Sequence, residues 1–239
     1  MTELLVNDKD IAVPGELLAK GMGYLPGVGT YRDGDNIFAS RVGLVSLDAR
    51  AIKLIPLSGR YLPKRGDTII GQVEEVMMSG WRINTGSAFS AVLNVRDASS
   101  DFIPKGANLT KYFTFGDYIV CKITNVTSQM LIDVTAKGPG LRKLHGGRII
   151  KVNSNKVPRV IGKKGSMVSM IKQATDCKLI VGQNGFIWIH GDDPNMELLA
   201  VKTVKKIESE SHLSGLTDRI KAYLENASGK KITGEQNGL

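Results

Sequence analysis

The sequence has few cysteines, few aromatic side chains and no long apolar runs, and each shortage argues against a class of protein. Its 239 residues contain two cysteines, Cys121 and Cys177, with no CxxC pair, so neither a zinc ribbon nor a disulfide framework is supported. Aromatic residues make up 6% while glycine occurs 27 times, which favours short strands and turns over a helical bundle. The apolar runs fall far short of the roughly 20 residues that span a membrane. We therefore expect small β-containing modules, two buried thiols and no membrane span.

The sequence also lacks a signal peptide and the common catalytic motifs. Glu3 and Asp8 stand where a signal peptide needs basic residues, so we expect a cytoplasmic protein. No GxxxxGK[ST], GxSxG or HExxH string occurs, and only three histidines are present. The pair Asp192-Asp193 either recruits a metal ion or caps the helix that follows, and the proline after it favours the cap. We expect no enzymatic activity, no cofactor and no metal site.

Positive charge is concentrated in one part of the chain. Residues 1–60 and 61–135 are each balanced at seven bases and seven acids, whereas residues 136–239 carry eighteen bases against nine acids. Within that last part, residues 136–165 hold nine bases and no acid, which matches the net charge of +9. Such a block attracts nucleic acid or anionic lipid. Lipid is the weaker idea, because glycines and prolines interrupt any amphipathic helix here. A solvated basic face without a partner is the remaining alternative.

The chain divides into modules at its turns. Residues 1–62 read as a small β domain, with a hairpin predicted around Asp33-Gly34. Residues 63–136 contain five short strand candidates, at 68–76, 80–84, 90–93, 118–125 and 130–134. Five strands at this spacing are typical of the OB-fold barrel, although a β-sandwich fragment would look similar.

In residues 146–212 the spacing of apolar residues alternates between that of strands and that of helices, which predicts an α/β domain. A C-terminal helix and tail follow over 213–239. Strand candidates at 148–152, 177–181 and 186–190 alternate with helices at 157–161, 166–175 and 194–210, in the order β-α-α-β-β-α. The turn Gly162-Lys163-Lys164-Gly165 lies between the first two helices. Met167, Met170 and Ile171 follow it at helical spacing, which favours a place in the core over the lining of a base-binding groove.

The GKKG turn has the chemistry of a phosphate site. Gly162 and Gly165 let main-chain amides approach a phosphate closely, and Lys163 and Lys164 add charge. A helix that begins at about Ser166 would direct its positive end to the same place. Arg159 and Lys151 flank the turn. An ordinary turn between helices is the alternative, since a GxxG string by itself is common.

The predicted barrel offers weaker candidates for RNA contacts. Trp81 and Phe89 could stack on bases, with the cations Arg82, Arg96 and Lys111 near the phosphates. Trp81 could instead close the barrel, Phe89 could belong to its core, and the bases could be ordinary surface. Tyr112, Phe113 and Phe115 are expected to pack rather than stack.

Several strings resemble known families. GDTIIGQV (66–73), SGWRI (79–83) and GDYIVCKI (116–123) resemble the S1 RNA-binding domain, an OB-fold family. The element order around GKKG resembles the KH domain, whose GxxG loop clamps about four nucleotides. A glycine-rich β module followed by S1 and KH resembles the RNA-binding cap subunits of the archaeal exosome, and VPGELLAKG and GVGTYRDGDNIFASRVG strengthen that match.

The resemblance to the cap subunits implies a role in RNA processing and degradation. It implies three copies on a hexameric phosphorolytic ring, docked through residues 1–62, which bind single-stranded RNA and pass it to a 3'-to-5' exoribonuclease without cutting it. The cap type with a zinc ribbon lacks support, because the cysteine pairs are missing. A free-standing RNA-binding regulator of transcription or translation is the alternative, although it has no evident need of the neutral module at 1–62.

Overall fold

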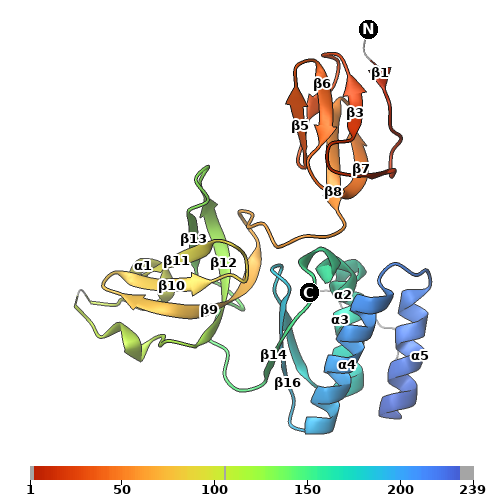
Figure 1. Cartoon of the computed structure of the whole chain (residues 1–239). Helices are drawn as coiled ribbons and strands as arrows, with labels where there is room; N and C mark the ends of the chain where they lie inside the picture. The colour runs from red at the N-terminus through yellow and green to blue at the C-terminus, as the bar shows by residue number, and fades with distance from the viewer. Residues whose placement is uncertain (1–2, 105, 232–239) are drawn as a thin grey trace. The chain divides into compact units, whose positions relative to one another are not determined.

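The computed structural model describes residues 3–104 and 106–231 and divides the chain into two compact units, 1–59 and 60–239 (Figure 1). The fold class predicted from the sequence is confirmed: a β domain comes first, then a five-stranded barrel and an α/β region. Within the described ranges, no helix is long and apolar enough to cross a membrane. The ends of the predicted segments 1–62 and 213–239, residues 1–2 and 232–239, lie outside the described residues.

The first unit consists of two four-stranded sheets around one core. The first sheet has the order β1 (Glu3–Leu4), β3 (Leu17–Lys20), β6 (Asn36–Ala39), β5 (Thr30–Asp33), and the second has the order β2 (Ile11–Ala12), β7 (Gly43–Asp48), β8 (Ala51–Pro56), β4 (Leu25–Pro26). The antiparallel pair β5–β6 forms the predicted hairpin, and Gly34 in its turn has a positive φ of 56°. Leu18, Ile37 and Ile52 are fully buried between the strands.

The second unit begins with a closed barrel, so the sandwich alternative is wrong. The strand order is β10 (Gly80–Asn84), β11 (Ser90–Asn94), β13 (Ile132–Thr135), β12 (Tyr118–Val126), β9 (Thr68–Met77). Short helical turns, α1 (Val95–Ala98) and η1 (Leu109–Lys111), lie in the connection from β11 to β12. The last strand starts later than predicted, because Met130 has a φ of 62° and belongs to the preceding turn.

The α/β region has the predicted element order. Its antiparallel sheet runs β14 (Arg148–Lys151), β16 (Phe186–His190), β15 (Lys178–Val181). Its helical elements are η2 (Ser154–Lys156), α2 (Val157–Ile161), η3 (Lys163–Gly165), α3 (Ser166–Thr175), α4 (Pro194–Glu210) and α5 (Leu216–Ser228). Asp193 caps α4, since its Oδ1 accepts a hydrogen bond from the Asn195 N–H at 2.8 Å. This confirms the capping interpretation for Asp193.

The sheet of the α/β region is covered on both faces. Side chains of a strand alternate between faces, and Leu179, Ile187 and Ile189 pack in one core with the helices. The opposite face packs against the barrel and the connection from β13 to β14, in a cluster that contains Ile70, Val120, Leu144, Ile149, Ile180 and Trp188. Barrel and sheet therefore share a second core.

Candidate nucleic-acid interface

The GKKG turn adopts a backbone that its glycines make possible. Gly162 ends α2 with a φ of 75°, and its N–H donates to the Pro158 carbonyl at 2.9 Å. A Cβ at Gly162 would lie 2.7 Å from the Met167 nitrogen, closer than real contacts allow. Gly165 also has a positive φ, 79°, but open space surrounds the position of its Cβ. Lys164, between them, has a φ of 52°. The turn therefore places Gly162 close to the start of α3 (Ser166–Thr175).

Exposed cations surround this turn. Lys163, Lys164 and Arg159 are exposed, and none forms an ion pair with another described residue. Among the described residues, no side chain caps the first turn of α3, which begins at Ser166 directly after the turn. The first N–H groups of a helix lack intrahelical partners and carry partial positive charge. The turn and the helix before it therefore carry three exposed charges next to a helix start that has no side-chain cap, as an anion site requires.

The apolar residues after the turn belong to the core. Met167 and Ile171 are 4% and 0% exposed and pack with α4 and the sheet, while Met170 is half-buried beside them. The core interpretation of these three residues is confirmed.

Several cations of the basic stretch 136–165 make contacts within the chain. Lys143 Nζ lies 2.5 Å from Asp117 Oδ2, and Arg148 Nε lies 3.2 Å from Glu197 Oε2. Lys151 Nζ lies 5.5 Å from the centre of the Phe186 ring. Lys156 Nζ donates a hydrogen bond to the Glu208 carbonyl near the end of α4. The cations that make no ion pair, main-chain bond or ring contact with a described residue are Lys137, Arg142, Arg159, Lys163 and Lys164.

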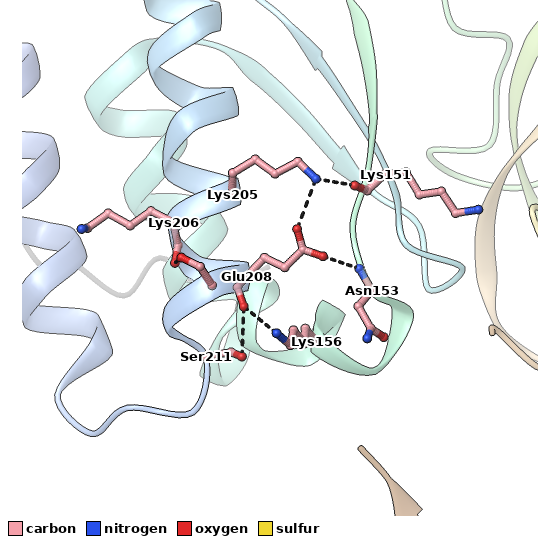
Figure 2. Close-up of polar contacts among 8 residues, drawn as sticks. Lys151, Asn153, Lys156, Lys205, Lys206, Glu208 and Ser211 are labelled. Atoms are coloured by element: carbon pink, nitrogen blue, oxygen red, sulfur yellow. Dashed lines mark hydrogen bonds and ion pairs between the residues drawn. The ribbon is translucent and has the colours of Figure 1, made fainter. Parts of the chain in front are cut away.

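Glu208, near the end of α4, organises the basic residues around it (Figure 2). Its Oε1 accepts from the Asn153 N–H at 2.7 Å, and its Oε2 lies 3.2 Å from Lys205 Nζ. Lys205 also donates to the Lys151 carbonyl at 2.7 Å. The Glu208 carbonyl accepts from Lys156 Nζ at 2.8 Å. These bonds fix the end of β14 and the start of α2 against α4, so Lys156 and Lys205 serve the fold.

The barrel residues predicted to contact RNA differ in their exposure and contacts. Trp81 is fully buried, its Nε1 donates to the Phe113 carbonyl at 2.9 Å, and its ring meets that of Phe113 edge to face. The prediction that Trp81 stacks on bases is therefore wrong, because the side chain points into the barrel. Phe89 is half-buried and packs against the barrel core. Arg82 is exposed but pairs with Glu75 at 2.9 Å.

The remaining barrel candidates, Arg96 and Lys111, are exposed on α1 and η1. Two aromatic residues of the barrel region that were not among the predicted candidates are also exposed: Phe102 by 87% and Phe115 by 75%. The expectation that Phe115 packs is wrong, whereas Phe113 is buried as expected. Phe115 directly precedes the Gly116-Asp117 turn and lies outside a strand. This position was the feature of the sequence that could have indicated its exposure.

Burial and hydrogen bonding shift the pKa of several groups in the second unit, among them Cys121 and Glu197. Both cysteines are buried, as predicted, and burial raises the pKa of Cys121 to about 12. The Gly191 N–H, helped by Arg148, lowers the pKa of Glu197. These contacts favour the carboxylate form of Glu197, which pairs with Arg148.

Comparisons with known proteins match the whole series of modules. The family described as "Exosome complex exonuclease RRP4 N-terminal region" matches residues 11–48, "RRP4, S1 domain" matches 60–125, and "KH domain" matches 147–195. The exosome complex component Rrp4 of Pyrococcus furiosus is 43% identical over 227 residues, which cover 94% of this chain and 86% of that protein. The chain belongs to the Rrp4 family.

Other Rrp4 relatives and a solved structure agree. The Rrp4 component of Methanothermus fervidus is 42% identical over 222 residues, which cover 92% of this chain and 97% of the relative. A crystal structure assigned as an exosome complex RNA-binding protein is similar with a TM-score of 0.64 at 34% identity, over 71% of this chain and 97% of that one. The family resemblance inferred from the S1 and KH strings is confirmed.

Proposed function

We propose that this chain is a non-catalytic, RNA-binding cap subunit of an archaeal exosome. It recruits single-stranded RNA and guides it to a phosphorolytic 3'-to-5' exoribonuclease ring. The observation that carries the proposal is the GKKG turn, where Lys163, Lys164 and Arg159 surround the uncapped start of α3 in a chain of the Rrp4 family. A phosphate bound at this turn would be attracted by the side-chain charges and would accept hydrogen bonds from main-chain N–H groups.

Residues 1–59 support the docking half of the proposal. They carry six bases and seven acids, so they make a poor polyanion site, yet they expose apolar side chains such as Ile11 and Val28, by 65% and 63%. Exposed apolar residues on a small β unit suit a protein partner. We propose that three copies dock through this unit on a hexameric ring.

RNA binding is tested with fluorescently labelled single-stranded RNA and the full chain. Lys163→Asp/Lys164→Asp should weaken binding by at least about a hundredfold, because repulsion replaces two phosphate contacts. The matched control, Lys20→Asp/Lys202→Asp, makes the same charge change at exposed lysines outside the site and should lose much less. If the two folded double variants bind equally, the GKKG turn is not the clamp.

Docking and activity are tested separately. The full chain mixed with a purified ring should give, by native mass spectrometry, three copies per ring, and a chain lacking residues 1–59 should not associate. Failure of the full chain to join would favour the free-standing regulator. The chain alone, incubated with RNA and inorganic phosphate, should leave the RNA at full length.

A further inference from the structure

Strand β14 (Arg148–Lys151) leaves part of its main chain without a partner. It is one edge of the three-stranded sheet and pairs only with β16. Just beyond the strand, Val152 donates its N–H to the Gly185 carbonyl, on the β16 side, at 2.8 Å. Main-chain groups alternate in direction along an antiparallel strand. Residues 148, 150 and 152 therefore bond toward β16, and residues 149, 151 and 153 face outward.

Helix α4 already uses some of the outward groups. The Lys151 carbonyl accepts from Lys205 Nζ at 2.7 Å, and the Asn153 N–H donates to Glu208 Oε1 at 2.7 Å (Figure 2). The N–H and C=O of Ile149 and the N–H of Lys151 have no strand partner, and no other described residue bonds to them. An extended chain laid along β14 can pair with all three groups.

The surface next to this edge is positively charged. The side chain of Arg148 is 58% exposed, whereas that of its partner Glu197 is 11% exposed. The side chain of Lys205 is 50% exposed beside that of Glu208, which is 22% exposed. Lys151 is exposed and forms no ion pair within the described ranges. The cations are thus more exposed than the carboxylates, so the edge attracts acidic groups.

These cations lie on both faces of the sheet. Ile150 packs in the core with the helices, and Ile149 packs in the core shared with the barrel. Because side chains alternate along a strand, Arg148 is on the helix face with Lys205, and Lys151 is on the barrel face. Figure 2 shows the Lys151 side chain extending away from α4. An added strand therefore has a cation next to it on either face.

The chemistry of the edge favours an acidic protein segment over two other occupants. Neither β14 nor α4 contains an aromatic residue, so both lack the stacking platforms that single-stranded RNA uses. A second copy of this chain would bring its own Arg148 and Lys151 to the same ladder, where like charges repel. An extended peptide offers donors and acceptors at the spacing of a strand, and acidic side chains add the complementary charge.

We propose that the outer edge of β14 is a docking site for an extended acidic segment of a protein partner, which joins the sheet as a fourth strand. Arg148, Lys151 and Lys205 pair with its carboxylates. Docking here uses no residue of the GKKG turn and takes protein rather than RNA, so it extends the proposed function without resting on it.

Binding of an acidic peptide to the full chain is measured by fluorescence anisotropy. The probe is a labelled peptide of about eight residues in which glutamate and valine alternate, because this pattern is acidic and favours a strand. A peptide with lysine in place of glutamate should bind at least about tenfold more weakly. A peptide with glycine in place of valine keeps the charge and should bind about fivefold more weakly, because glycine disfavours a strand. Equal binding of all three peptides would overturn the proposal.

Two variants of Lys151 separate main-chain pairing from charge. Lys151→Pro removes the outward N–H without removing a bond to β16, and an edge strand tolerates proline at such a position. Lys151→Gln removes the same charge and keeps the N–H. The proline variant should bind the acidic peptide at least about threefold more weakly than the glutamine variant. Thermal melting checks that both fold, and equal affinities of the two folded variants would exclude strand addition.

Amide hydrogen exchange of the unmodified chain, followed by NMR spectroscopy, locates the peptide without any variant. Saturating acidic peptide should slow exchange of the Ile149 and Lys151 N–H groups at least about tenfold, whereas the Ile150 N–H, which faces β16, should change little. Unchanged exchange at Ile149 and Lys151 would contradict the proposal, and so would protection of both by single-stranded RNA but not by the peptide. The proposed function is judged separately, by the RNA affinity of Lys163→Asp/Lys164→Asp.

Discussion

Asn184, in the turn between β15 and β16, makes two hydrogen bonds to Ile70 in barrel strand β9. Its Nδ2 donates to the Ile70 carbonyl at 2.7 Å, and its Oδ1 accepts from the Ile70 N–H at 3.3 Å. The same Nδ2 donates to the Thr85 carbonyl at 2.8 Å. Asn184 is 2% exposed. One buried side chain therefore satisfies three main-chain groups of the barrel.

Asn184→Ala should lower the free energy of unfolding by about 2–4 kcal/mol, because it leaves buried polar groups without partners. Urea denaturation measures the change. Asn94→Ala is the control, since Asn94 is exposed and its side chain makes no cap hydrogen bond to a described residue. The control should change stability by less than about 0.5 kcal/mol. Equal effects of the two substitutions would contradict the role given to Asn184.

The two glycines of the GKKG turn should differ in tolerance. Gly162→Ala combines a positive φ with a Cβ 2.7 Å from the Met167 nitrogen, so it should cost about 3 kcal/mol or more. Gly165→Ala has the positive φ and open space, so it should cost only about 1–2 kcal/mol. Thermal unfolding of the full chain compares them. The reverse order would mean that the turn does not approach α3 as described.

Substitution of Lys156 should affect mainly stability, and substitution of Arg159 should affect mainly RNA binding. Lys156→Gln removes a donor to the Glu208 carbonyl, and we expect a loss of about 1 kcal/mol in stability with little effect on RNA affinity. Arg159→Gln should leave stability within about 0.5 kcal/mol and weaken RNA binding severalfold. Denaturation and anisotropy titrations of both variants provide the comparison. A larger loss of affinity in Lys156→Gln than in Arg159→Gln would refute this division of roles.

Trp81 and Phe115 should behave in opposite ways. Trp81→Phe leaves the buried Phe113 carbonyl without its 2.9 Å donor, so stability should fall by about 1–3 kcal/mol. Phe115→Ala removes a ring that is 75% exposed and should change stability by less than about 0.5 kcal/mol. If Phe115 stacks on a base, its loss weakens RNA binding by about 1–3 kcal/mol. Melting curves and RNA titrations distinguish the two.

Glu197 should make stability depend on acid pH. The Gly191 N–H, at 2.9 Å, and Arg148 lower its pKa from the ordinary value of 4.5. A carboxylate whose folded pKa is lowered contributes stability that is complete above its unfolded pKa and is lost as pH falls through the folded pKa. Glu197→Gln should therefore lower stability at neutral pH and flatten the decline below about pH 4.5. Unfolding measured from pH 7 to pH 2 tests this, and parallel curves for the two proteins would rule it out.

The elements of the α/β region could be predicted because their signals are local. Glycines at 162 and 165 mark the turn, and the proline after Asp193 marks the start of α4. The direction of Trp81 was also available from the sequence, since residues two apart share a face of a strand. Trp81 lies on the face of apolar Ile83, and Arg82 between them points outward.

The use of each cation could not be predicted in the same way. Asp117, Glu197 and Glu208 hold Lys143, Arg148 and Lys156 from distant parts of the chain, so charge counting alone overestimates the bases available to RNA.

The two-sided burial of the α/β sheet also determines where this protein can be cut. A fragment that starts at Arg148 would expose to water the face that carries Ile149, Ile180 and Trp188, and such apolar surface promotes aggregation. The portion suited to transplantation into another protein is therefore the whole of residues 60–231. The sequence alone, which predicts the barrel and the α/β region as separate domains, does not show this. Exchange of the α/β part between relatives would have to carry along the barrel surface around Ile70 and Val120.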